Sequence, residues 1–280
     1  MSVVIFAKPD DIHVNRITEY LNDFTIIGEY EIENEITMAA NRHSSSTVYL
    51  NDEPLLATAV FWRNLDIYPF AGHDQYLSNH IAYMRLFLEG FKDARWVNPI
   101  QCFIEHYTKL DQMKIDANFP NTLITNRKDL ALEFAQQFEA VAVKPIAGGA
   151  YVPKLVIENI EDFESDVFSS PLVFQEFIQG TNLRTFVIGD QVFTAKNSSE
   201  LPDFRLDTNM KYTAIDLTDE QNSHCLDISN TLGYEYTAID WIERDNELYY
   251  LEANYAPIYG FFEDQTGYPI SESIAKLLIN

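Results

Sequence analysis

Two oxygen-bearing side chains stand close together near the end of the chain, in the segment LYYLEAN. Glu252 and Asn254 are two residues apart in an otherwise apolar and aromatic run. Residues i and i+2 of a β-strand point to the same face, so the carboxylate and the amide would be neighbours on one surface. A hard cation such as Mg²⁺ binds such oxygens together with nucleotide phosphates. A solvated strand end would give the same pattern, and the segment alone favours that plainer interpretation.

A third oxygen donor stands on the strand that precedes this one. TAIDWIERDNELYYLEAN predicts a hairpin that turns at Asp245-Asn246, with Asp240 on its first strand. Because the turn pairs the two strands, the acidic groups of Asp240 and Glu252 can converge on one face. Asp240 could instead face solvent at a strand end, but the hairpin favours the metal site.

A lysine earlier in the chain has the setting of a phosphate ligand. Lys144 ends the apolar strand AVAVKPI and precedes a short loop that contains Gly148 and Gly149. A lysine at the mouth of a sheet, beside glycines that let backbone amides approach a ligand, suits a phosphate. A surface lysine before a turn would look the same.

The next strands carry two further candidate groups. In PLVFQEFI, the residues Gln175, Glu176 and Phe177 offer strand backbone of the kind that reads an adenine edge. Arg184 follows on the next predicted strand, where a buried cation requires a partner or a ligand.

Composition limits the classes of partner. The 280 residues include 43 acidic and 19 basic side chains, a formal net charge of -24. This charge argues against a nucleic acid or an anionic membrane surface as the main partner. The sequence has no segment typical of a membrane span or signal peptide. Cys102 and Cys225 lack metal-binding spacing, so we expect reduced thiols in a cytoplasmic protein.

The elements that must position these residues follow from periodicity and turn residues. A strand at 3–7 and a helix open the chain, and a hairpin turns at Asn51-Asp52 before a buried strand. The middle of the chain is rich in predicted strands. Helices are predicted at 74–91, 104–116, 127–138, 220–232 and in ISESIAKLLI. Asn126 and Ser271 are the expected N-caps of two of them.

Taken in order, these segments resemble the ATP-grasp ligases. The resemblance runs from VAVKP through QEFIQGTNLRTFVIGD to the TAIDWI hairpin and LEAN, and it covers essentially the whole chain. It implies an α/β (α+β) fold with three lobes and nucleotide between the last two. The predicted domains are an N-terminal pre-ATP-grasp α/β domain at 1–103, a central lid domain at 104–185 and a C-terminal domain at 186–280.

The resemblance also implies cofactors and site residues. ATP and Mg²⁺ are expected, with Asp240, Glu252 and Asn254 as the metal ligands. The residues assigned to nucleotide binding are Lys109, Lys144, Gly148, Gly149, Gln175, Glu176, Phe177, Ile178 and Asn182. Arg184 and Arg205 would stabilise the transferring phosphoryl group and the tetrahedral adduct.

Several of these assignments have plainer alternatives. Arg205 could equally pair with a neighbouring aspartate in a surface loop, and Lys109 could be a solvated helix residue. Arg63, in FWRN, could bind a substrate carboxylate or an acidic neighbour, and the neighbour is favoured.

The segments FPNTLITN, DFRLD and LEANYAPIYGFFEDQTGYPIS are most similar to the graspetide (microviridin-type) synthetases and the related ribosomal-protein glutamyl ligases. The chain departs from the superfamily pattern at two places. The loop after Lys144 is poor in glycine, and Asn182 stands where a carboxylate often precedes the arginine.

Three functions follow from the resemblance. The first is an ATP-dependent ligase that activates a carboxylate as an acyl-phosphate and forms ester or amide crosslinks in a ribosomally made precursor peptide. The second is a ligase that joins amino acids or a dipeptide, and the third is a non-catalytic nucleotide-binding protein of the same fold. The expected partner is therefore a small peptide or amino acid. The oligomeric state stays open, a homodimer included.

Overall fold

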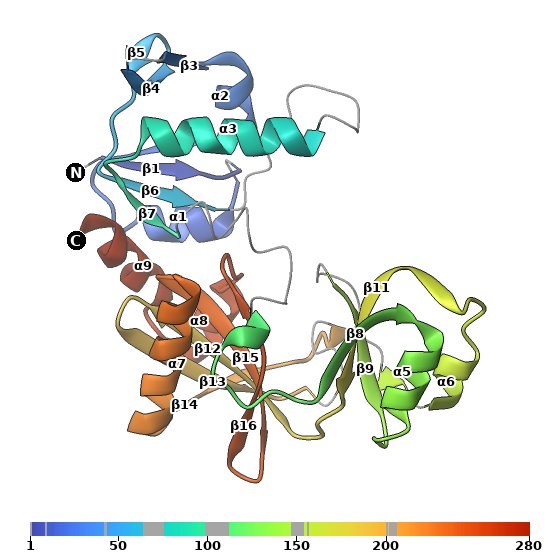
Figure 1. Ribbon diagram of the computed structural model, residues 1–280. Coiled ribbons are helices and arrows are strands. Elements are labelled where there is room, and N and C mark those ends of the chain that lie inside the picture. The colour runs from blue at the N-terminus through green and yellow to red at the C-terminus, as the bar shows by residue number, and fades with distance from the viewer. Residues whose placement is uncertain are drawn as a thin grey trace.

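The computed structural model describes residues 2–8, 10–41, 44–63, 76–98, 112–146, 154–155, 157–199, 201 and 206–280. Figure 1 shows three bodies of secondary structure: an N-terminal lobe, a central lobe built around β8, β9 and β11, and a C-terminal lobe built around β12, β13, β15 and β16. Over this part of the chain, each helix is too short or too polar to span a bilayer.

The N-terminal lobe is built on a parallel sheet. Its strands, in spatial order, are β2 (Phe24–Ile27), β1 (Val3–Phe6), β6 (Ala59–Trp62) and β7 (Arg95–Val97). The VVIF and AVFW strands are entirely buried, as expected for parallel strands covered on both faces. The helices of this lobe are α1 (Ile12–Thr18), α2 (Glu29–Asn34) and α3 (Tyr76–Gly90). A small sheet of β3 (Ile36–Asn41), β4 (Ser44–Leu50) and β5 (Glu53–Pro54) packs beside α3.

The central lobe is an antiparallel sheet with helices on one face. A single 3-10 turn, η1 (Gln112–Lys114), precedes it. Its strands, in spatial order, are β10 (Lys154–Leu155), β9 (Val141–Pro145), β11 (Val167–Glu176) and β8 (Thr122–Arg127). The helices α5 (Lys128–Ala135) and α6 (Ile157–Glu161) cover it, and Phe174 is completely buried in the core beneath them.

The C-terminal lobe is a five-stranded antiparallel sheet. The strand order is β14 (Tyr212–Ile215), β13 (Gln191–Asn197), β12 (Thr181–Ile188), β15 (Tyr236–Arg244) and β16 (Glu247–Asn254). One face packs Trp241 in a core shared with helix α7 (Asp219–Leu232). The other face packs Phe186 in a core shared with α8 (Gly260–Thr266) and α9 (Ile270–Ile279), which also includes residues of the N-terminal sheet.

Side chains at the lobe boundary strengthen this shared core. The Nδ2 atom of Asn98 donates to the carbonyl oxygens of Tyr236 at 2.5 Å and Tyr255 at 2.6 Å. Its Oδ1 atom accepts from the backbone N–H of Tyr236 at 2.9 Å. Arg16 binds both carboxylate oxygens of Asp264, at 2.8 and 2.9 Å. The N-terminal and C-terminal lobes are therefore joined by hydrogen bonds as well as by apolar packing.

A buried histidine lies at the same boundary. His13 accepts a hydrogen bond on Nδ1 from the backbone N–H of Gly260 at 3.2 Å. Burial and the nearby Arg63 guanidinium lower the pKa of His13 to about 4. The imidazole is therefore neutral at pH 7.

The three tryptophans divide between two of the cores. Trp62 and Trp96 lie in the core beneath α3, and Trp241 lies in the core beneath α7. Each is less than a tenth exposed.

The mixed α/β fold is confirmed, with three corrections to element boundaries. Asn126 is not a cap, because β8 continues to Arg127, which pairs with Val167 of β11. Ser271 lies inside α9, where its hydroxyl donates to Glu263 at 2.7 Å. The described end of the helix predicted at 104–116 is only the 3-10 turn η1.

The predicted division into three domains stays a prediction. Its boundary at residue 185 falls inside β12, and all of β12 pairs within the five-stranded sheet.

Candidate functional site

Three charged side chains form a row across the five-stranded sheet. Arg184 on β12 lies directly opposite Asp240 on β15, and Asp240 lies directly opposite Glu252 on β16. Opposite residues on adjacent antiparallel strands share a face and have their Cβ atoms about 5 Å apart. The two antiparallel pairings therefore bring one cation and two carboxylates together.

The side chains of this row make direct contacts. Nη1 of Arg184 donates to Oδ1 of Asp240 at 2.9 Å and to Oδ2 at 3.2 Å. Asn254 extends the row, because its Nδ2 lies 3.2 Å from Oδ2 of Asp240 and 3.4 Å from Oε1 of Glu252. The three predicted metal ligands thus converge, as the hairpin pattern predicts.

The ion pair at the centre of the row is shielded from water. The side chains of Arg184 and Asp240 are 14% and 10% exposed. Burial, the largest single influence, opposes the charge on Arg184, but the combined attraction of Asp240, Glu252 and two nearby tyrosines outweighs burial, and the pKa of Arg184 is raised. The Nε atom of Arg184 is buried and has no hydrogen-bond partner among the described residues. The guanidinium therefore keeps one donor for a further group.

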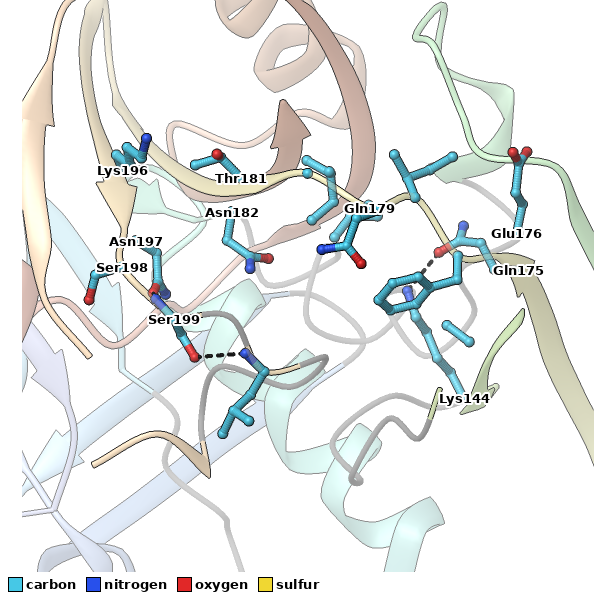
Figure 2. Close-up of a pocket in the computed structure, with 17 residues that line it drawn as sticks. Lys144, Gln175, Glu176, Gln179, Thr181, Asn182, Lys196, Asn197, Ser198 and Ser199 are labelled. Carbon is cyan, nitrogen blue, oxygen red and sulfur yellow. Dashed lines mark hydrogen bonds between the residues drawn. The ribbon is translucent and has the colours of Figure 1, made fainter. Parts of the chain in front are cut away.

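A cavity of about 630 Å³ opens beside this row, between the central and the C-terminal sheets (Figure 2). The predicted site residues that line it are Lys144, Gln175, Glu176, Phe177, Ile178 and Asn182. Asn182 is two residues before Arg184 on β12, so both side chains share the face that meets the cavity. Leu251, next to Glu252 in the chain, also lines it. The lining thus includes neighbours of the row, whereas Arg184, Asp240 and Glu252 are not among the lining residues.

The central-lobe side of the cavity holds the predicted lysine in place. Nζ of Lys144 donates to Oε1 of Gln175 at 2.7 Å, and Nε2 of Gln175 donates to the hydroxyl of Thr122 at 3.0 Å. Lys144 pairs with Val173 across β9 and β11, so the lysine and the glutamine come from neighbouring strands. Figure 2 shows the contact between Lys144 and Gln175 at the edge of the cavity.

Backbone groups near Glu176 are partly engaged within the fold. The N–H of Glu176 donates to the carbonyl of Asn121 at 2.8 Å, and the N–H of Phe177 donates to Ala140 at 3.1 Å. The carboxylate of Glu176 accepts from Nδ2 of Asn121 at 2.7 Å. In Figure 2 this carboxylate points away from Lys144. A ligand contact by these two N–H groups would therefore compete with bonds of the sheet.

The remaining predicted residues divide into two groups. Lys109, Gly148, Gly149 and Arg205 lie outside the described residues. Arg63 is buried, with Nη1 donating to the carbonyl of Ala256 at 2.9 Å and Nε lying 3.6 Å from Asp11. The acidic-neighbour interpretation of Arg63 is thus confirmed.

Sequence reasoning missed the C-terminal-lobe side of the cavity. Lys196, Asn197, Ser198 and Ser199 line it at the end of β13. A signal was available in AKNSS, because it ends the hairpin partner of the strand that carries Arg184. Figure 2 places Lys196 and Lys144 on opposite sides of the cavity.

The carboxylates of Asp240 and Glu252, which both lie within 3.4 Å of the Asn254 amide nitrogen, have the chemistry that a magnesium ion requires. Among the described residues, no group of three His, Cys, Asp or Glu side chains is placed to hold a metal. The amide of Asn254 therefore has to complete the set with Asp240 and Glu252. With the Asn254 amide turned from the donor orientation that it has here, two carboxylates and one amide oxygen, completed by phosphate oxygens, would fit the hard-ligand preference of Mg²⁺.

Comparison with known proteins agrees with this arrangement. Residues 106–278 match the RimK-like ATP-grasp domain, so the chain belongs to the RimK-like ATP-grasp family. A protein of Histophilus somni described as a probable alpha-L-glutamate ligase is 27% identical over 167 residues, which are 54% of this chain and 55% of that protein. The chain thus spans about half the length of the curated relatives that it matches.

Two solved structures have the same fold. The ATP-grasp ligase PsnB, in complex with a precursor variant, Mg and ADP, aligns with a TM-score of 0.82 at 20% identity, covering 100% of this chain and 98% of that chain. The macrocyclase MdnC from Microcystis aeruginosa, bound with precursor peptide MdnA, aligns with a TM-score of 0.83 at 20% identity, covering 100% of both chains. The predicted ATP-grasp fold is thereby confirmed.

Proposed function

We propose that this protein is an ATP-dependent ligase that joins a carboxylate to an amine or hydroxyl through an acyl-phosphate. One observation carries the proposal: the row of Arg184, Asp240 and Glu252 adjoins Asn182 and Leu251, which line a cavity that Lys144 also lines. Cations and a carboxylate pair near one cavity suit a polyphosphate with a metal ion. Catalysis of this kind rests on position and counter-charge rather than on a protein nucleophile.

Asp240, Glu252 and Asn254 would hold Mg²⁺, with the amide of Asn254 turned to present its oxygen. When bound, the ion neutralises charge on the phosphate oxygens. Lys144, held by Gln175, would bind the phosphates from the central lobe. Lys196 is the corresponding cation on the C-terminal side.

Arg184 has two roles in this proposal. One edge of its guanidinium binds Asp240 and orients that carboxylate. Its Nε is buried without a partner among the described residues and would donate to the transferring phosphoryl group. A preorganised donor of this kind typically contributes ~10²–10³ in rate.

The nucleoside end of ATP would occupy the cavity near Phe177 and Ile178. Because the N–H groups of Glu176 and Phe177 are engaged in the fold, we place the adenine edge against the backbone at Ile178. The apolar side chains of Ile242 and Leu251 would then contact the nucleoside from the opposite wall.

The proposed substrate is a ribosomally made precursor peptide that receives ester or amide crosslinks. PsnB and MdnC, whose fold the chain shares, are both known in complex with precursor peptides. The test mixes the purified protein and MgATP with the short peptide encoded beside its gene. Each crosslink removes one water from the peptide mass, and the Glu252→Gln variant serves as the matched control. A peptide that is unmodified while ATP is consumed would exclude this substrate.

A second substrate class is favoured by the curated relatives. A relative described as a probable alpha-L-glutamate ligase matches over half of the chain. Adding glutamate to the same assay separates the two classes, because glutamate ligation increases the mass of the acceptor whereas crosslinking decreases it.

ATP binding without turnover for either substrate would support a non-catalytic nucleotide-binding protein. We also propose that the protein can form a homodimer, and a measurement of its molar mass in solution tests this.

A further inference from the structure

The strand that carries two of the proposed metal ligands is an edge strand. β16 pairs with β15 on one side only and is last in the order of the five-stranded sheet. Its residue Ala253 lies between Glu252 and Asn254 and is almost completely buried. An edge strand leaves backbone N–H and C=O groups unpaired on its outer side, and burying them unpaired is costly. The outer backbone groups of Ala253 therefore require a partner.

A glutamine side chain supplies that partner. Nε2 of Gln112 donates to the carbonyl of Ala253 at 2.8 Å, and Oε1 of Gln112 accepts from the N–H of Ala253 at 3.0 Å. This two-point pairing is what a residue of a neighbouring strand would provide. Gln112 itself is buried, at 6% exposure. A primary amide presents a donor and an acceptor side by side, as this fork requires.

A tyrosine completes the hydrogen bonding of the glutamine. The hydroxyl of Tyr250 donates to Oε1 of Gln112 at 2.8 Å. This bond is compatible with the orientation that the two bonds to Ala253 already fix, with Oε1 toward the N–H and Nε2 toward the carbonyl.

The backbone on both sides of the next ligand is fixed as well. The hydroxyl of Thr237 donates to the carbonyl of Asn254 at 2.8 Å, and Nδ2 of Asn98 donates to the carbonyl of Tyr255 at 2.6 Å. Ala253, Asn254 and Tyr255 thus each have a carbonyl bound by a side chain from another segment. Of the three side chains that bind these carbonyls, Gln112 is the one that contacts Ala253, the residue between the two proposed metal ligands.

We propose that Gln112 is a positioning residue for the magnesium ligands. By pairing both backbone groups of Ala253, it fixes the peptide planes from which Glu252 and Asn254 project. The two side chains then leave the strand toward Asp240 with a fixed separation. This inference rests on the proposed function, because it concerns the metal site named there.

The test measures how strongly Mg²⁺ increases the affinity of the protein for ADP. Calorimetric titration of ADP is run in EDTA and in Mg²⁺, and the ratio of the two dissociation constants reports the metal site alone. Gln112→Met keeps the length of the side chain and removes all three hydrogen bonds. Loss of a group that orients metal ligands typically costs about 10–100-fold in metal affinity. We expect the ratio to fall by that factor, with ADP affinity in EDTA unchanged.

A matched control separates positioning from general destabilisation. Tyr250→Phe removes only the hydroxyl bond to Gln112 and leaves the two-point pairing with Ala253 in place. It should keep the ratio within about twofold of the wild-type value, a change of about 0.4 kcal/mol, because the two bonds to Ala253 still orient the Gln112 amide. If Gln112→Met fails to fold, Gln112→Glu is used, which keeps the shape and an acceptor but loses the donor to Ala253.

Two outcomes separate failure of this inference from failure of the proposed function. A folded Gln112 variant with a wild-type ratio, while Glu252→Gln abolishes the Mg²⁺ effect, would overturn the positioning role only. An unchanged ratio in Glu252→Gln would overturn the metal site itself.

Discussion

Replacing Asp240 with asparagine should destabilise the folded protein even without nucleotide or metal. The substitution leaves the Arg184 guanidinium buried at 14% exposure with no carboxylate opposite it. Breaking a buried ion pair by removing one partner costs about 3–5 kcal/mol. Asparagine still offers Nη1 an oxygen in place of Oδ1, so we expect the lower end, about 3 kcal/mol. For a chain of this size the midpoint of thermal unfolding should fall by about 6–12 °C.

The assay is calorimetric unfolding in EDTA, with Glu252→Gln as the matched control. Glu252 is only partly buried, and the carboxylate that accepts both hydrogen bonds from Arg184 is that of Asp240, so this variant should unfold within about 2 °C of the wild type. The double variant Asp240→Asn with Arg184→Met should recover much of the lost stability, because it removes the uncompensated charge. Equal midpoints for Asp240→Asn and Glu252→Gln would refute the reasoning.

Two further predictions concern pH and nucleotide binding. The folded pKa of His13, about 4, lies below its ordinary value of 6.5, so its contribution to stability is complete above pH 6.5 and is lost as the pH falls toward 4. Urea titration should show that the wild type loses about 2 kcal/mol more than His13→Gln between pH 8 and pH 5, and parallel pH profiles would contradict this. Lys144→Met should weaken ATP binding about 10–100-fold by calorimetry, since a hydrogen bond to a charged group contributes about 1.5–3 kcal/mol. Lys276→Met, at an exposed position of α9, is the control, and equal losses in both lysine variants would count against a phosphate contact by Lys144.

Local turn chemistry in the sequence is sufficient to place the hairpins. Asn51, Asp52, Asp245 and Asn246 all have positive φ angles between 51° and 66°, a conformation that Asn and Asp tolerate better than most residues. The prediction of Asn126 as a helix cap was wrong because strand pairing extends through this residue. Strand pairing with β11 carries β8 past Asn126 to Arg127, and no local signal in the sequence reports that pairing.

The candidate site likewise combines contacts that local sequence predicts with contacts that it does not predict. The turn between β15 and β16 sets their register, so the approach of Asp240 to Glu252 can be predicted from the hairpin alone. The partner of Asp240, Arg184, is 56 residues away in the chain, and its pairing depends on which strands become neighbours. The same holds for Gln112, whose contact with Ala253 spans 141 residues. Such contacts require the folded topology.

The distribution of the tryptophans has an optical consequence. Trp62, Trp96 and Trp241 are the only indoles in the chain, and all three lie in the cores of the N-terminal and C-terminal lobes. Excitation at the indole band therefore reports on those two lobes, while the central lobe contributes no emission of its own. A single tryptophan introduced at Phe174, in the core beneath α5, would give that lobe its own spectroscopic signal. Its emission would distinguish local opening of the central sheet from unfolding of the whole molecule.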